Sequence, residues 1–264
     1  GAELWSSSLG DQATQCDPAN ESGDGLIRFA ATPDGRWGVF GEDFAPNIVD
    51  LATGKAHTSQ LNLHVAGNVL AVPADGNSSA FDPGTLTKAG TFTGFQFNND
   101  PDIAPTGLLD DGPGSSEDGS IVFGLKPPAD DSSESDRLVA YSLPSMKVAW
   151  SVPTDSPYLI GEAGGVLLLN VGDPNPKLVA LEVNTGRRLW AVPAGEVCGF
   201  TRSQLLLGIN AQLATLDMKN GKQLSYTTDG DTCPDIRPGG IGIGTGSIEP
   251  GEEHGVTVTQ VLKP

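Results

Sequence analysis

Three cysteines, Cys16, Cys198 and Cys233, are the side chains of this sequence with the most distinctive chemistry. No two of them form a CxxC pair, so neither a zinc knuckle nor a thioredoxin-like redox motif is indicated. Three thiolates could in principle hold a metal ion, but no histidine stands near them in the sequence and we predict no metal site. A disulfide is the favoured alternative, and the odd count leaves at least one cysteine unpaired within a monomer.

Clustered carboxylates are a second source of chemistry. Asp110-Asp111-Gly112 is followed by Glu117-Asp118-Gly119, and residues 130–136 carry four further acidic side chains. A calcium site needs several oxygen ligands at ordered spacing, and the D-x-D-x-D-G pattern does not occur. We therefore expect solvated loops and predict no bound cofactor, with calcium left open for these clusters.

Catalytic motifs are missing from the sequence. His57, His64 and His254 are scattered, and neither a G-x-S-x-G nor an H-E-x-x-H pattern occurs. Gly239–Gly246 is similar to a glycine-rich phosphate loop, but no Lys-Ser/Thr follows it, so a closely packed strand is the better interpretation. We predict no catalytic residue, although a Ser-His-Asp arrangement is spatial and stays open.

The charge balance excludes one large class of partner. Fifteen Lys and Arg residues stand against 33 Asp and Glu residues, for a formal net charge of −18. Nucleic-acid binding needs clustered basic side chains, so no nucleic-acid partner is predicted, and the acidity is typical of a soluble exported surface. No run of about 20 apolar residues occurs, so this segment is not expected to insert into a membrane. An anchor upstream of Gly1 stays open.

The elements that position these side chains belong to a repeat. Leu178–Pro193 has the pattern of an alternating strand, a turn at Asn184-Thr185-Gly186 and a second strand that contains Trp190. Degraded copies occupy residues 138–153 and 212–227, and weaker copies occupy 47–55 and 79–87. Asn tolerates left-handed backbone and Gly supplies positive φ, as this hairpin turn requires. Hairpin repeats of roughly 40 residues are typical of a radial β-propeller.

We therefore predict an all-β fold, a single β-propeller domain over residues 1–264 with six four-stranded blades of about 44 residues, or alternatively seven. Blade three is expected to begin at Phe92–Phe97. Glu3–Trp5 would be an outermost strand without its blade, and residues 255–262 a third strand without its fourth. Pairing these N-terminal and C-terminal strands would close the ring and remove exposed edges. The blade-packing aromatic residues are expected to be Trp5, Trp150, Trp190 and Tyr226.

The repeat resembles the pyrroloquinoline-quinone-type (PQQ-type) β-propeller repeat. The matching residues are Ala180–Trp190 and Leu216–Lys222, and Ala31–Trp37 is similar to a turn of other propellers. Quinoprotein dehydrogenases of that family usually carry a disulfide between adjacent cysteines and a Ca²⁺ site. Since this sequence has no adjacent cysteines, PQQ is not predicted as a cofactor. The resemblance implies the non-catalytic bacterial extracytoplasmic branch, which includes an outer-membrane assembly lipoprotein and exported sensor domains.

The phase of the repeat also orders the cysteines. Cys198 follows Trp190 by eight residues and Cys233 follows Tyr226 by seven, so both fall near the first strands of successive blades. These strands would be neighbours around the central channel, which favours a Cys198–Cys233 disulfide that closes a loop of 34 intervening residues. Cys16, eleven residues after Trp5, is an alternative partner for Cys233.

These features predict a non-enzymatic extracytoplasmic binding or scaffold module that recognises a protein, peptide or cell-envelope ligand at a channel mouth. Two alternatives stay open. One is a small or degenerate propeller enzyme, a hydrolase or oxidoreductase, with its site in the central channel; carboxylates of perturbed pKa around a deep pocket would favour it. The other is a structural module that presents its acidic face within a larger anchored chain.

Overall fold

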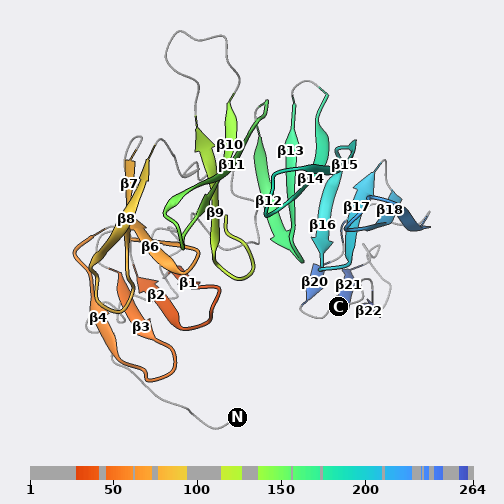
Figure 1. Cartoon of the computed structure of the whole chain (residues 1–264). Coiled ribbons are helices and arrows are strands. Elements are labelled where there is room, and N and C mark those ends of the chain that lie inside the picture. The colour runs from red at the N-terminus through yellow and green to blue at the C-terminus, as the bar shows by residue number, and fades with distance from the viewer. Residues whose placement is uncertain are drawn as a thin grey trace. The chain divides into compact units, whose positions relative to one another are not determined.

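The computed structural model of the protein describes residues 28–41, 46–61, 63–72, 77–93, 114–126, 136–155, 157–172, 175–209, 212–227, 233, 235–237, 241–245 and 256–260. Within these ranges every regular element is a β-strand. The chain divides into two compact units, Gly1–Thr154 and Asp155–Pro264, and each is described by itself. Within each sheet, every strand pairs antiparallel with the next along the chain (Figure 1). Among the described residues there is no helix with the length and apolar character that a membrane span requires.

The described part of the first unit holds three sheets. The first sheet consists of β1 (Arg28–Ala31), β2 (Trp37–Gly41), β3 (Asn47–Asp50) and β4 (Ala56–Thr58). The second consists of β5 (His64–Ala66), β6 (Val69–Val72), β7 (Asn77–Phe81) and β8 (Lys88–Thr93). The third consists of β9 (Ile121–Lys126), β10 (Arg137–Ser142) and β11 (Lys147–Pro153). Ser115 forms an isolated bridge to Val122, where a first strand of this third sheet would lie.

The second unit also holds three sheets among its described residues. One consists of β12 (Tyr158–Ala163), β13 (Val166–Val171), β14 (Lys177–Glu182) and β15 (Arg188–Pro193). The next consists of β16 (Glu196–Phe200), β17 (Gln204–Ile209), β18 (Gln212–Asp217) and β19 (Gln223–Thr227). The C-terminal sheet consists of β20 (Asp235–Arg237), β21 (Ile241–Thr245) and β22 (Val256–Gln260).

Antiparallel sheets of three and four strands are the architecture expected of propeller blades, and the all-β class is confirmed at this level. One blade boundary is wrong in the sequence-based prediction. Phe92 belongs to β8, the fourth strand of the second sheet, and does not open the third. The error arises at the turn before β8, where Leu86 takes the positive φ of 53° that glycine takes in the clearer copies. A fourth strand in the first sheet, β4, was also not predicted.

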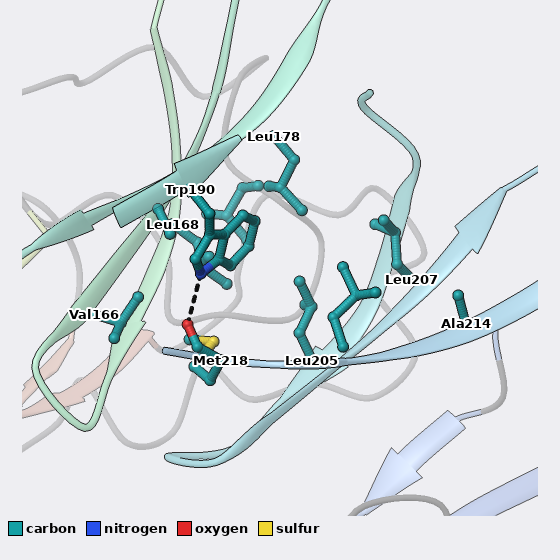
Figure 2. Close-up of a cluster of buried hydrophobic side chains, with 11 residues drawn as sticks. Val166, Leu168, Leu178, Trp190, Leu205, Leu207, Ala214 and Met218 are labelled. Carbon is teal, nitrogen blue, oxygen red and sulfur yellow. Dashed lines mark hydrogen bonds between the residues drawn. The ribbon is translucent and has the colours of Figure 1, made fainter. Parts of the chain in front are cut away.

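Successive sheets whose side chains are described pack face to face within each unit through hydrophobic residues. In the second unit the packed layer contains Trp190, Leu168 and Leu178 from one sheet and Leu205, Leu207 and Met218 from the next or its turn (Figure 2). In the first unit Ile48 packs with Leu70 across the first pair of sheets, and Phe92 packs with Tyr141 across the second. Four consecutive residues of β13, Val166 to Leu169, are buried, so both faces of that strand are covered.

A β-bulge recurs between the third and fourth strands and sets which residue faces inward. The register shifts after Ala140, Ala180 and Thr215, so that Trp150 lies opposite Ala140 and Trp190 lies opposite Ala180. At the same register position of β19 the residue is Ser225, opposite Thr215. Tyr226 is therefore one residue out of phase with the two tryptophans, because it follows its turn glycine by five residues where Trp190 follows its own by four.

Candidate functional site

The two cysteines that the repeat brings into equivalent positions are bonded to each other. Cys198 lies in β16, the first strand of its sheet, and Cys233 lies two residues before β20, the first strand of the C-terminal sheet. Their Sγ atoms are 2.02 Å apart in a disulfide, with Cα atoms at 4.9 Å. Both side chains are half-buried and so within reach of small thiols. Cys16 lies outside the described residues.

The predicted aromatic residues differ in what the structure describes. Trp150 and Trp190 are 9% and 8% exposed, on β11 and β15 respectively. The indole Nε1–H of Trp190 donates a hydrogen bond of 2.8 Å to the carbonyl of Met218, in the turn before β19. Tyr226 has only its backbone described, and Trp5 lies outside the described residues.

Asp118, from one of the predicted acidic loops, lies in a tight turn. The Ser116 hydroxyl donates to its carboxylate at 2.7 Å, and the backbone N–H and hydroxyl of Ser120 donate at 3.0 and 2.7 Å. These hydrogen bonds, that from Ser116 foremost, hold the pKa of Asp118 below its usual value of 3.8. The Oδ1 atom of Asp118 is thus committed to hydrogen bonds within the turn. Asp110, Asp111 and the acidic residues 130–134 lie outside the described residues.

No cluster of metal-ligating side chains is present in the described part of the chain. There, no group of three or more His, Cys, Asp and Glu residues could hold a metal ion. His57 lies on β4 and His64 on β5, in different sheets, and His254 lies outside the described residues. Ile241–Thr245, within the glycine-rich segment, forms the strand β21, in line with its interpretation as a strand.

Turns between first and second strands meet at one end of the sheets in the first unit. Asn68, in the turn between β5 and β6, accepts a hydrogen bond from the backbone N–H of Asp34 through Oδ1 at 3.1 Å. Its side-chain amide donates to the carbonyl of Asp118 at 2.8 Å, and its backbone N–H donates to the carbonyl of Gly119 at 3.1 Å. The Asn68 side chain thus links the corresponding turns of three successive sheets. These three turns therefore lie at the same end of their sheets.

The same alignment holds for the first two sheets of the second unit. A Cβ atom on Gly164, in the turn between β12 and β13, would lie 3.0 Å from the carbonyl oxygen of Arg202, in the turn between β16 and β17. Each sheet also ties its two turns together, because the N–H of Val183 donates to Gly165 and the N–H of Met218 donates to Ser203. We call this hydrogen-bonded end of the sheets in each unit the turn end.

By the antiparallel order of the strands, connections that follow second and fourth strands begin at the end of each sheet opposite its turn end. They comprise residues 42–46, 59–63, 73–76, 94–115, 127–136, 154–157, 172–176, 194–195, 210–211, 228–234 and 246–255. These segments together hold 18 Asp and Glu residues and no Lys or Arg, while Lys126, Arg137 and Lys177 lie on strands directly beside them. The turns of the turn end hold six basic and four acidic residues, and the adjoining strand ends add Asp50, Glu182 and Asp217. We call the set of connections in each unit its acidic end.

This charge polarity was missed by the sequence-based prediction, which considered the net charge of the whole chain. The signal is the position of each acidic residue relative to the strand order, and it becomes visible once every strand is numbered within its sheet. Of these 18 acidic residues, Asp136 and Asp155 are described, and the other connections are located only by the strands that flank them. The acidic end of each unit, taken by itself, is therefore the candidate functional region.

Comparison with known proteins identifies similarity to solved structures only. No family model matches the chain, and no curated protein matches it. Among solved structures the chain is similar to BamB from Moraxella catarrhalis, with 11% sequence identity and a TM-score of 0.43. The similarity covers 89% of this chain and 68% of that one.

Proposed function

We propose that the protein is a non-enzymatic extracytoplasmic binding module whose acidic end recognises a basic segment of a protein or peptide. The observation that carries this proposal is the segregation of charge within the sequence, with 18 acidic and no basic residues in the connections that follow second and fourth strands. The disulfide between Cys198 and Cys233 supports an extracytoplasmic location, because structural disulfides persist in oxidising compartments.

The two ends of the sheets suit this division of roles. At the turn end, backbone groups and carboxylates such as Asp118 and Asp217 bond to one another within and between turns, which rigidifies the scaffold. The acidic end carries the longer connections, and loops that leave a rigid scaffold are where binding residues concentrate. A field of one sign attracts a partner of opposite charge and speeds its association.

The scaffold we propose is one β-propeller over residues 1–264, with six blades closed by pairing Glu3–Trp5 with the C-terminal strands. Support comes from β22, which has β21 on one edge and no strand on the other among the described residues, and from the likeness of Leu4-Trp5 to Leu189-Trp190. Deletion of residues 1–8 is expected to lower the midpoint of thermal unfolding by several degrees, since an uncovered edge strand loses its pairing. An unchanged midpoint would contradict closure by this segment.

Neutralising acidic residues tests the binding function. A fluorescent lysine-rich peptide is titrated with the purified chain, and the variant Asp130→Asn/Asp131→Asn removes two charges from the connection between β9 and β10. We expect its Kd to rise about fivefold, on the basis of about 0.5 kcal/mol for each exposed charge. The effect should shrink as ionic strength rises, because salt screens exposed charges.

The matched control changes the net charge equally at the turn end. Ser145→Lys/Asn184→Lys also adds two units of charge, at exposed positions in turns before β11 and β15. It should leave the Kd near its original value. Equal weakening by both variants would show attraction to net charge alone and would contradict recognition at the acidic end. Turnover of a hydrolase or oxidoreductase substrate by the purified chain would favour the enzyme alternative.

A further inference from the structure

The disulfide links two sheets whose strands differ greatly in their content of large apolar residues. The sheet β16–β19 packs against β12–β15 through a cluster of large buried side chains, among them Trp190, Leu205 and Leu207. Its second strand, β17, has three consecutive buried leucines. Such a layer holds its sheets together by hydrophobic burial, with about 2 kcal/mol for each fully buried leucine.

The strands of the C-terminal sheet have fewer large apolar residues. Its central strand β21 has the sequence IGIGT, so isoleucine alternates with glycine, and β22 alternates valine with threonine. The backbone register pairs Ile243 with Val258, and Gly242 with Thr259. Five of the 13 residues in β20, β21 and β22 are isoleucine or valine, and none is leucine or aromatic.

The disulfide crosses the contact between these two sheets. Cys198 is in the first strand of one sheet and Cys233 directly precedes the first strand of the other, and β16 lies near β20. Figure 1 shows these two strands and the C-terminal strands β21 and β22 in the same unit. A covalent bond therefore joins a leucine-rich sheet to a sheet whose strands contain no leucine.

We propose that the Cys198–Cys233 disulfide is a redox-controlled cross-link, and that it keeps the C-terminal sheet, β20–β22, folded against the sheet β16–β19. Oxidised, the bond limits the separation of the two sheets. Reduced, the C-terminal sheet opens on its own while the core between β12–β15 and β16–β19 stays closed. Since both cysteines are half-buried, small dithiols can reach the bond.

Opening requires a dithiol reductant, and the exchange balances. A thiolate of the reductant attacks one sulfur, so that the Cys198–Cys233 bond breaks and a mixed disulfide forms. The second thiol of the reductant then closes its own disulfide. Two electrons pass to the protein, which takes up two protons as Cys198 and Cys233 become thiols, and the reductant leaves oxidised. A disulfide such as oxidised glutathione reverses the change.

Hydrogen exchange measured by mass spectrometry on the whole chain tests this proposal. After reduction by a dithiol, amides of residues 235–260 should exchange on the order of 100-fold faster, which corresponds to the loss of a cross-link over a loop of this length. Amides of β13, β14, β17 and β18 should keep their rates. The variant Cys198→Ser/Cys233→Ser should show the fast pattern without reductant, and Cys16→Ser should keep the oxidised pattern until reductant is added.

Two results would overturn the proposal. Unchanged exchange of residues 235–260 after reduction would show that packing alone holds the C-terminal sheet. Equal acceleration throughout residues 155–264 would show that the bond stabilises the unit as a whole. Reoxidation with oxidised glutathione should restore the slow amide exchange of residues 235–260. Failure to restore it would exclude a reversible cross-link.

Discussion

Replacement of Trp190 by alanine is expected to lower the free energy of unfolding of the second unit by about 3–5 kcal/mol. The indole is 8% exposed and lies in the layer between β12–β15 and β16–β19 (Figure 2). Truncation removes this apolar surface from the core and leaves a cavity that surrounding leucines fill only in part. It also leaves the carbonyl of Met218 without the hydrogen bond from Nε1. The loss of unfolding free energy is measured by urea unfolding, with hydrogen exchange of the amides in β17 and β18 as the probe.

Two further variants separate the causes. Trp190→Phe keeps an aromatic ring but removes the donor to Met218, so we expect a loss of about 1–2 kcal/mol. Leu224→Ala truncates an apolar side chain on the neighbouring strand β19 that is 50% exposed, and should cost no more than about 0.5 kcal/mol. If Trp190→Ala costs no more than Leu224→Ala, the indole does not hold the two sheets together.

The clearest repeat could be predicted from sequence because its determinants are local. Leu178–Pro193 becomes β14, a turn and β15, with Glu182 accepting hydrogen bonds from the side chains of Thr185 and Arg187. Alternating burial along the strands and a glycine with positive φ at Gly186 suffice to specify this hairpin. The hydrogen bond from Thr185 lowers the pKa of Glu182, which keeps the carboxylate in its acceptor form at neutral pH.

The predicted blade boundary and the predicted phase of Tyr226 failed where the repeat departs from its clearest copy. Leu86 and Met146 take positive φ at the turn position that Gly186 and Gly221 occupy in the clearer copies, so glycine does not mark that position. Tyr226 follows its turn glycine by five residues where Trp190 follows its own by four, and the bulge shared by these strands is needed to see the difference in phase. Neither a bulge nor a strained turn residue is dictated by the alternation of apolar residues alone.

The candidate site shows the same division between local and spatial information. Equivalent positions in successive repeats were enough to favour pairing of Cys198 with Cys233. The bridge that Asn68 makes between Asp34 and Asp118 depends on turns 34 and 50 residues away in sequence, and no pattern in the sequence announces it. The charge polarity lies between these cases, because it follows from the sequence once strand order within each sheet is known.

Replacement of Gly221 by alanine is expected to cost about 2–4 kcal/mol, through two separate effects. Gly221 has a φ of +67°, a conformation that costs an L-residue about 1 kcal/mol. An added Cβ would also lie 2.8 Å from Cγ and Cδ2 of Trp190, closer than real Cβ contacts, and the buried ring has little room to move. Overpacking of this kind costs about 1–3 kcal/mol. Urea unfolding of the second unit again supplies the measurement.

Gly165 provides the matched control in the same unit. Its φ is +81° and a Cβ there would meet nothing within 4 Å, so Gly165→Ala carries only the backbone cost of about 1 kcal/mol. In a Trp190→Ala background the ring is absent, and Gly221→Ala should then cost no more than Gly165→Ala. The double-mutant cycle should therefore give a coupling of about 1–3 kcal/mol between positions 190 and 221. Zero coupling would mean that the contact between position 221 and the Trp190 ring has no effect on stability. The turn before β19 would then not hold the indole in place.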